Sequence, residues 1–351
     1  TLPLSYTDNS FLFNYNRVQG FFLGWEIPKK ITGKYRFLSI HGFGGYGFSE
    51  KTWRYEIGAD RWFFNQTDYR FEVGAKAYDL TDTKDTWLLT PCENTVSSLV
   101  LHRDYQDFYR RNGYEVHASQ NLSIFFKGTL AYRNVDYSSL SNHTNWALFG
   151  KRDFRLNPMI EDGNMRSLFA ELYFDNRNDI ENPSRGWFAK LQMESSTSKL
   201  KSDFSFNQYL FELRRYQPLG RHERLDMRVK VATSEGDVPL QKRYHLGGVG
   251  TLRGYKYKTI DGGSVYGGDR MLLANVEYYL DPRSWGGDFL FFDDLNYILF
   301  FDVGRIWNRA DVTDNDSWSA GFSDMGLNDL KSDIGIAFTT WEGKARLSIA
   351  K

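Results

Sequence analysis

Two short runs of residues have types and spacing that could support chemistry. The run GFGGYG at residues 42–47 matches the G-x-G-x-x-G pattern, in which glycines let a backbone approach a dinucleotide just before a helix. Residues 48–51 lead instead into another predicted strand, so we interpret these glycines as positions where a strand bends. Asp311, Asp314 and Asp316 could bind a divalent cation, but the Gly and Glu spacing of an EF-hand is missing. A solvated acidic loop is the simpler interpretation.

The sequence contains no histidine or nucleophile motif that would indicate a catalytic or metal-binding site. The sequence has neither an H-E-x-x-H pair of metal ligands nor a G-x-S-x-G nucleophile elbow. The six histidines are scattered, at His41, His102, His117, His143, His222 and His245. We therefore expect no enzyme activity, no cofactor and no metal site.

The composition favours strands and excludes several classes. The 44 basic and 44 acidic residues cancel, so no net charge points to a nucleic-acid partner. Aromatic residues make up 17% of the 351 residues, which suits a pleated sheet. Cys92 is alone, so an intrachain disulfide is impossible. The first residues lack the charged region and apolar core of a secretory signal, so we expect any such signal to have been removed.

The elements that must position any site are predicted from a period of two. Apolar residues alternate with charged ones from Leu225 to Val231, and runs at 53–60, 167–174, 187–194 and 209–214 behave similarly. Such alternation indicates strands with one face covered. Mean hydropathy is −0.54, and no run reaches the roughly 18 apolar residues of a membrane helix. A membrane barrel needs no such run, because only every second residue faces lipid.

A soluble sandwich is the alternative to a membrane barrel. The runs are about ten residues long, which is near the length of a tilted membrane strand and longer than most sandwich strands. Turn lengths also alternate between short and long. Aromatic residues crowd the ends of the runs, where membrane interfaces would lie; they are Trp25, Tyr35, Trp53, Trp62, Phe63, Trp187, Tyr216, Trp307 and Trp341.

We predict fifteen strands of one antiparallel, transmembrane, all-β barrel. They are expected at 12–27, 36–47, 52–63, 70–79, 95–103, 113–120, 123–135, 165–175, 187–195, 204–216, 224–234, 270–280, 296–307, 332–341 and 344–351. With a periplasmic N-terminus, the inner turns include 48–51, 121–122, 217–223 and 342–343, and the outer loops include 136–164, 235–269 and 308–331. Two inner connections, 80–94 and 281–295, are longer than expected. Because bacterial barrels have even strand numbers, a sixteenth strand follows Lys351 or the count is one too high.

Four segments carry a resemblance to a known family. They are YHLGGVGTLRGY at 244–255, GDRMLLANVEY at 268–278, FFDVGRIW at 300–307, and the turn from Asp175 to Gly186. The first resembles the sixth outer loop of the bacterial surface antigen barrels, which include the barrel domains of BamA/TamA assembly factors and two-partner secretion transporters. The resemblance implies a barrel of the sixteen-strand type whose long sixth loop folds inward. It is specific over 165–351 and generic over 1–135.

The resemblance also implies a loop latch. It places Arg253, Gly254 and Tyr255 at the tip of the inward-folded loop, with Gly247 and Gly248 as its support, and pairs Arg253 with Glu277 and Asp302. The alternation agrees, because Glu277 lies on the less apolar face of its strand, and Asp302 would be costly facing lipid. The other interpretation is a solvated loop arginine with two ordinary lumenal acids.

The run 13–20 is predicted to open the barrel. Its polar residues should pair weakly with a closing strand that is missing or unpaired, and we assign the seam to Tyr15, Asn16, Arg17 and Gly20. The first functional hypothesis is a bacterial outer-membrane barrel that assists insertion, assembly or translocation of polypeptides through this seam by strand addition. A solute pore and a structural anchor or accessory barrel are the alternatives.

The expected domain organisation follows from the strand assignment. Only about eleven residues precede the first predicted strand, so residues 1–351 are interpreted as one barrel domain without the periplasmic transport modules of the family's assembly factors. The expected partners are outer-membrane lipid and, under the first hypothesis, substrate barrel proteins or periplasmic partners. No nucleic acid is expected.

Overall fold

The strands form one sheet in the order of the sequence. The computed structural model describes residues 10–30, 37–64, 69–150, 152–221, 223–260, 266–280, 295–311, 317–322, 325–340 and 346–351. Fifteen strands are hydrogen-bonded to their sequence neighbours from β1 to β15. Pairing is antiparallel from β1 to β7 and again from β11 to β15. The predicted all-β class and the predicted strand count are confirmed.

The regular elements have the following bounds. The strands are β1 (Ser10–Asn16), β2 (Gly20–Ile27), β3 (Leu38–Gly47), β4 (Thr52–Phe63), β5 (Phe71–Asp82), β6 (Tyr109–Asn121), β7 (Phe126–Ser139), β8 (Gly163–Asp175), β9 (Gly186–Ser196), β10 (Phe206–Pro218), β11 (Glu223–Gly236), β12 (Arg270–Leu280), β13 (Leu295–Trp307), β14 (Lys331–Thr340) and β15 (Arg346–Ala350). The helix α1 spans Pro91–Leu101, and single 3-10 turns lie at Asp85–Trp87, Ser198–Leu200, Leu240–Lys242, Arg309–Asp311 and Leu327–Asp329. Within the described ranges, no helix has the length and apolar character to cross a membrane.

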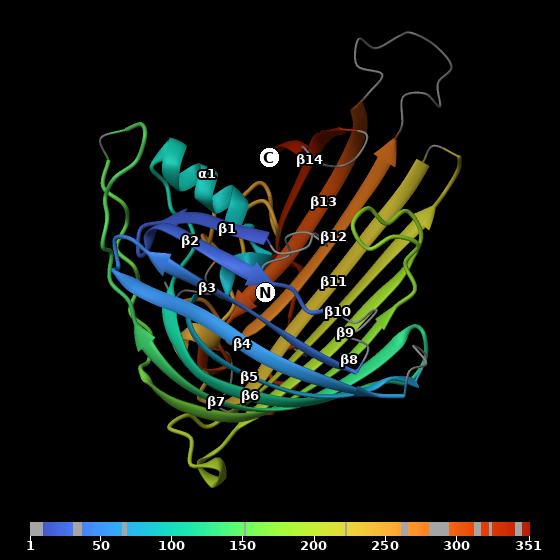
Figure 1. Ribbon diagram of the computed structural model, residues 1–351. Helices are drawn as coiled ribbons and strands as arrows, with labels where there is room; N and C mark the ends of the chain where they lie inside the picture. Colours follow the sequence, from blue (N-terminus) through green and yellow to red (C-terminus); the bar gives the residue numbers. More distant parts are fainter. Residues whose placement is uncertain are drawn as a thin grey trace. The chain divides into compact units, whose positions relative to one another are not determined.

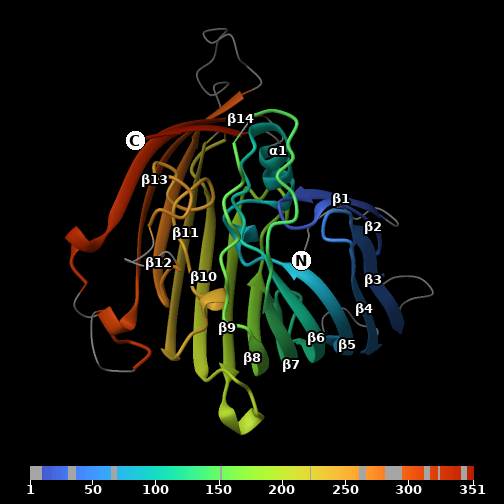
Figure 2. The same cartoon turned by 90° about the vertical axis from the view of Figure 1, so that its left-hand side faces the viewer.

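The chain divides into two compact units. The first comprises Thr1–Ala170, Glu194–Phe206 and Pro239–Lys242, and the second comprises Glu171–Met193, Asn207–Val238 and Arg243–Lys351. In the first unit, α1 packs against β1 (Figure 1). In the second, β11, β12 and β13 run side by side (Figure 2).

Two predicted strands were wrong, and the errors cancel in the count. The predicted strand 12–27 is the hairpin of β1 and β2, whose tip is residues 17–19. The side chain of Asn16 accepts hydrogen bonds from the N–H groups of Val18 and Gln19 and so turns the chain, and Gly20 continues it at a φ of +65°.

The predicted strand 95–103 is part of α1. Thr90 Oγ1 accepts a hydrogen bond from the N–H of Glu93, whose side chain accepts one from the N–H of Thr90. This capping box, with Pro91 in the first turn, starts a helix where a strand was predicted.

The new hairpin changes which connections share an end of the sheet. Residues 48–51, predicted as an inner turn, follow β3 and lie at the same end as the connections 83–108 and 140–162. The turn after β6 lies at the opposite end of the sheet. The prediction that 48–51, 80–94 and 121–122 all lie on the inner side is therefore wrong, because 48–51 and 80–94 lie at one end and 121–122 at the other. The predicted connection 281–295 and turn 342–343 fall on 281–294 and 341–345, outside the described residues.

The two faces of the sheet differ as the alternation predicts. On β11, Val229 is exposed and its neighbour Lys230 is buried, and on β12 Val276 is exposed while Met271 and Leu273 are buried. Many further large apolar side chains are exposed on the strands, which is typical of a sheet that faces lipid.

The predicted aromatic girdle is partly wrong. Trp25 and Trp53 are exposed, but Trp62 and Trp307 are buried. Trp62 Nε1 donates a hydrogen bond to Glu72 on the inner face, and the Trp307 ring packs edge-on against Phe322. Tyr35 and Trp341 lie outside the described residues.

Candidate functional site

The connection from β11 to β12 places Arg253 against the inner face of the second unit. Two isolated bridges, Tyr244 with Gly268 and Leu246 with Ile260, hold the described part of this connection in a narrow loop. Leu246 and Leu252 are fully buried and anchor it. The loop tip therefore points toward β12 and β13.

Arg253 meets both acids that the resemblance implies. Its Nε donates to Asp302 Oδ2 at 2.7 Å, and its Nη2 lies 2.5 Å from Asp302 Oδ1. Its Nη1 donates to Glu277 Oε1. The side chain of Arg253 is 5% exposed and that of Asp302 is 0% exposed. The guanidinium fork thus makes a two-point contact with one carboxylate and a third contact with the other.

The glycines of the loop support this geometry by different means. Gly247 and Gly248 have φ angles of +103° and +105°, which favour glycine. A Cβ on Gly247 would lie 2.3 Å from Lys256 O. Gly254, the third glycine of the predicted latch, does not have a positive φ. It instead allows close approach to β14, because its Cβ would lie 2.7 Å from Asp333 Cβ.

Tyr255, the last residue of the predicted latch, lies beside β14. Its hydroxyl donates to the backbone oxygen of Ser332 at 3.3 Å. The tip of the loop therefore contacts three consecutive strands, β12, β13 and β14.

Several contributors were not predicted from the sequence. Asn275 Nδ2 donates to Asp302 Oδ1 and to the backbone oxygen of Thr251, both at 2.8 Å, and so links the loop to the carboxylate. Arg346 on β15 donates to both oxygens of Glu277, at 3.1 and 2.8 Å. The alternation had placed Asn275 on the correct face, but no signal in a single sequence pairs Arg346 with Glu277.

The surroundings keep Arg253 charged. Burial alone would lower the pKa of Arg253, but its hydrogen bonds to Asp302 and the charge of Glu277 outweigh that effect, so this pKa is raised above its usual range. The Arg253 guanidinium also lies 3.6 Å from the centre of the Phe300 ring. A cavity of about 270 Å³ adjoins the latch and is lined by Arg228, Gly250 and Glu277 among others.

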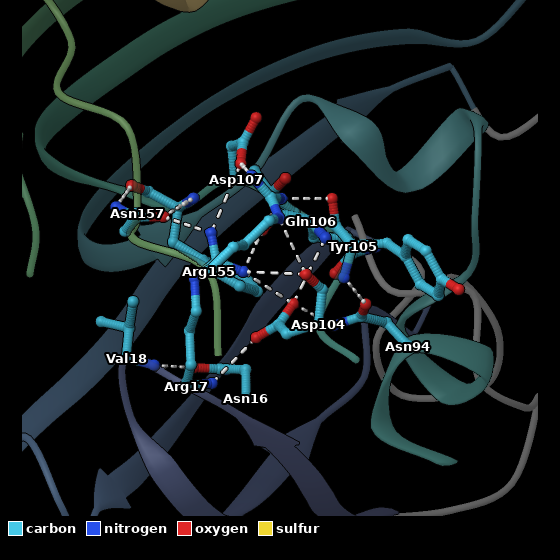
Figure 3. A network of polar contacts seen from close by, with 12 residues as sticks. Asn16, Arg17, Val18, Asn94, Asp104, Tyr105, Gln106, Asp107, Arg155 and Asn157 are labelled. Carbon is cyan, nitrogen blue, oxygen red and sulfur yellow. Dashed lines mark hydrogen bonds and ion pairs between the residues drawn. The ribbon is translucent and has the colours of Figure 1, made fainter. Parts of the chain in front are cut away.

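The predicted seam residues lie elsewhere, in the first unit, and they form a different arrangement from the one expected. Arg17 is in the hairpin tip and fully buried. Its Nη1 donates to the backbone oxygens of Asp104 and Gln106, and its Nη2 donates to Asn157 Oδ1 at 2.9 Å (Figure 3). Its own N–H donates to Asp104 Oδ2 at 2.8 Å. Burial lowers the pKa of Arg17, against the effect of the Asp104 charge.

Tyr15 and Gly20 are also held in place, by hydrogen bonds and by close packing respectively. The N–H of Tyr15 donates to Thr95 Oγ1 on α1 at 3.2 Å, and its hydroxyl donates to the backbone oxygen of Trp146. A Cβ on Gly20 would lie 2.1 Å from Ser49 Oγ. Because β1 is first in the strand order, α1 supplies a partner where a further strand would.

Comparisons with known proteins indicate the family. The model of the Omp85 superfamily domain matches residues 48–349. A segment of 141 residues is 30% identical to a protein of Nitratidesulfovibrio vulgaris named outer membrane protein assembly factor BamA, and it covers 37% of this chain and 17% of that protein. The chain thus spans a small part of this relative's length.

Two solved structures resemble the chain. BamA from Haemophilus ducreyi lacking POTRA domains 1-3 superposes with a TM-score of 0.63 at 15% identity, covering 98% of this chain and 66% of that one. CdiB from Acinetobacter baumannii gives a TM-score of 0.42 at 10% identity, covering 95% and 56%.

Proposed function

Because the chain belongs to the Omp85 superfamily, we propose that it is an outer-membrane barrel that assists the insertion, assembly or translocation of other polypeptides through a lateral seam. The observation that carries the proposal is the loop latch: Arg253 joins the β11–β12 connection to acids on β12 and β13. A plain solute pore has no evident need for such a contact. The named relative, an assembly factor, supports the same class.

The proposed seam lies at β1, the first strand in the order. An extended substrate segment would add to the edge of β1 opposite β2 by β-augmentation, in which backbone hydrogen bonds supply the affinity. Tyr15 already donates its N–H to Thr95 at this edge. Strand addition along the whole of β1 therefore requires α1 to move away, or it begins at the N-terminal part of β1. The partners under this proposal are substrate barrel proteins, periplasmic proteins and the surrounding lipid, with the N-terminus periplasmic.

Cysteine crosslinking tests the seam. Cys92, which is exposed, is first replaced by serine. One cysteine then replaces Phe13, whose side chain is exposed on β1, and a second replaces Leu347 or Ile349 on β15. The matched control locks β1 to β2 with cysteines at Asn14 and Phe22, which face each other in the register. The seam proposal expects a fully crosslinked β1–β15 pair to reduce the yield of other outer-membrane barrels, while the control does not.

Normal levels of other barrels with the β1–β15 lock complete would instead favour a pore or an anchor. The pore has one observation in its favour, a cavity of about 460 Å³ in the first unit whose lining includes Glu56, Lys76 and Glu115. Quantifying the outer-membrane proteome after depletion separates the alternatives. Loss of many barrels supports assembly, and altered solute uptake with an intact proteome supports a pore.

A further inference from the structure

A mixed cluster of histidine and carboxylate side chains lies on one face of β3 to β6. His41, Asp60, Glu72 and His117 come from these strands in order. The register sets them side by side, because Asp60 pairs with Gly74 and Gly74 pairs with His117. This cluster belongs to the first unit and shares no residue with the latch or the hairpin tip.

Three of these residues converge on one point. The Nε2 atom of His117 lies 3.1 Å from Asp60 Oδ1 and 3.2 Å from Glu72 Oε1. One ligand atom from each of Asp60, Glu72 and His117 falls within 4.8 Å of the others. Bonds of about 2.0–2.1 Å in a tetrahedral zinc site place neighbouring ligand atoms about 3.4 Å apart. The two distances from His117 Nε2 are close to that value, so an ion could enter between the histidine and each carboxylate with little movement of the ring.

His41 fixes the remaining oxygen of Asp60. Its Nε2 lies 2.7 Å from Asp60 Oδ2, while Asp60 Oδ1 is left facing His117. Asp60 is 1% exposed, and its Oδ1 has no hydrogen bond of acceptable geometry among the described residues. A buried carboxylate oxygen needs a polar or cationic partner, and a bound cation would supply one with better geometry than the His117 contact.

Two strand glycines make room for the rings. A Cβ on Gly58 would lie 2.5 Å from His41 Cε1. A Cβ on Gly74 would lie 1.9 Å from Asp60 Oδ1 and 2.6 Å from His117 Cε1. Glycine weakens the interior of a strand and often marks a close approach of other groups. Here both glycines lie directly under the cluster, and their lack of side chains permits its geometry.

One cation is already present in the cluster. Lys29, in the connection after β2, places Nζ 2.9 Å from Asp60 Oδ2 and 2.7 Å from Glu72 Oε1. Its side chain is 30% exposed, more than any of the other four, so it can swing into solvent. Lys29 therefore competes with any ion that binds the same carboxylates.

We propose that Asp60, Glu72 and His117 bind one divalent transition-metal ion of the zinc class. His41 orients Asp60 through its second oxygen, and Lys29 is displaced on binding. Three protein ligands leave one coordination position for water or another donor. The ion would join β4, β5 and β6 through side chains and so stiffen this part of the sheet.

Zinc titration of the detergent-solubilised full chain tests the proposal. Cys92→Ser is the parent, so that the thiol cannot contribute, and chelator-treated protein is titrated with Zn²⁺ by calorimetry. We expect one Zn²⁺ per chain, a higher melting temperature on binding, and loss of both effects in His117→Gln and Asp60→Asn. Bound Co²⁺ should show the intense visible absorption of a four-coordinate site.

Two further variants keep the test decisive if a ligand substitution disturbs folding. Lys29→Met removes the competing cation and should tighten zinc binding about tenfold, equivalent to about 1.4 kcal/mol. His102→Asn, at the end of α1, is the matched control and should bind zinc like the parent. The proposal is overturned if the parent and Lys29→Met both fail to bind zinc, or if folded His117→Gln binds it as well as the parent.

Discussion

Arg253 and Asp302 are 49 residues apart in the sequence and form a two-point ion pair, with Nε to Oδ2 at 2.7 Å and Nη2 to Oδ1 at 2.5 Å. Neither side chain has appreciable contact with solvent. In such surroundings, the loss of one partner leaves the other charge buried and uncompensated. The pair therefore couples the position of the loop to β13.

Arg253→Ala should destabilise the protein by about 3–5 kcal/mol, the usual cost of breaking a buried pair. A wet lumen would have reduced this to about 1–2 kcal/mol through screening, but the observed burial favours the larger cost. Denaturant unfolding measures the stability, and limited proteolysis should show cleavage within 237–269. Lys256→Ala, at an exposed position of the same loop, is the control. Equal protease resistance in both variants would contradict the latch.

Arg253→Lys should not restore the latch. An ammonium group makes one compact contact, whereas the guanidinium binds Asp302 at two points and Glu277 at a third. Protection of the loop should fall well short of the original level. Recovery of full protection would mean that charge alone holds the loop.

The latch should be insensitive to alkali. The pKa of Arg253 is raised, so the stabilisation it provides is complete below the unfolded pKa and is lost only as pH rises through the still higher folded value. Loop protection should stay constant from about pH 7 to pH 10, well below the usual pKa of arginine. A loss of protection within that interval would show that another group controls the loop.

Gly247→Ala should weaken the loop by about 1–3 kcal/mol through backbone strain. Its φ is +103°, and the new Cβ would lie 2.3 Å from Lys256 O. Gly44→Ala is a suitable control, since nothing lies within 4 Å of its Cβ position. Thermal unfolding should lower the melting temperature of the first variant only. A tolerated alanine at Gly247 would refute the assigned role.

Arg17→Ala should cost about as much as Arg253→Ala, because the side chain of Asp104 is fully buried and loses the guanidinium that balances its charge. The double variant Arg17→Ala/Asp104→Ala should cost less than the sum of the two single variants. Hydrogen exchange should report early opening of α1 and β1 in the single variant. Additive costs would show that the two residues act independently.

The features that could be predicted from the sequence are those that follow from a local residue pattern or from the family resemblance. The alternation of apolar and polar residues predicted most strands and the inward direction of the Glu277 side chain. The family resemblance predicted its contact with Arg253. The helix α1 was missed although Thr90, Pro91 and Glu93 form a start signal and the apolar residues Val96, Leu99 and Val100 have helical spacing. The tip at Arg17 was missed because its partners, Asp104 and Asn157, are distant in the sequence.

The contacts of the histidines were also missed because they join residues that are distant in the sequence. His41 and His117 meet the same carboxylate only because the strand registers align them. No spacing rule for a single segment can detect ligands that come from separate strands, so the sequence predicted no metal site.

The contacts of Arg17 also bear on the order in which the chain folds. Its nearest partner in the sequence lies 87 residues further on, and Asn157 lies 140 residues further on. Contacts that close such long loops form late, because chain entropy is lost before they can stabilise anything. The hairpin of β1 and β2 is therefore synthesised before these partners and is among the last elements to be fixed in place. Until the segment around α1 folds onto it, its edge is open to any extended chain nearby, including another copy of itself.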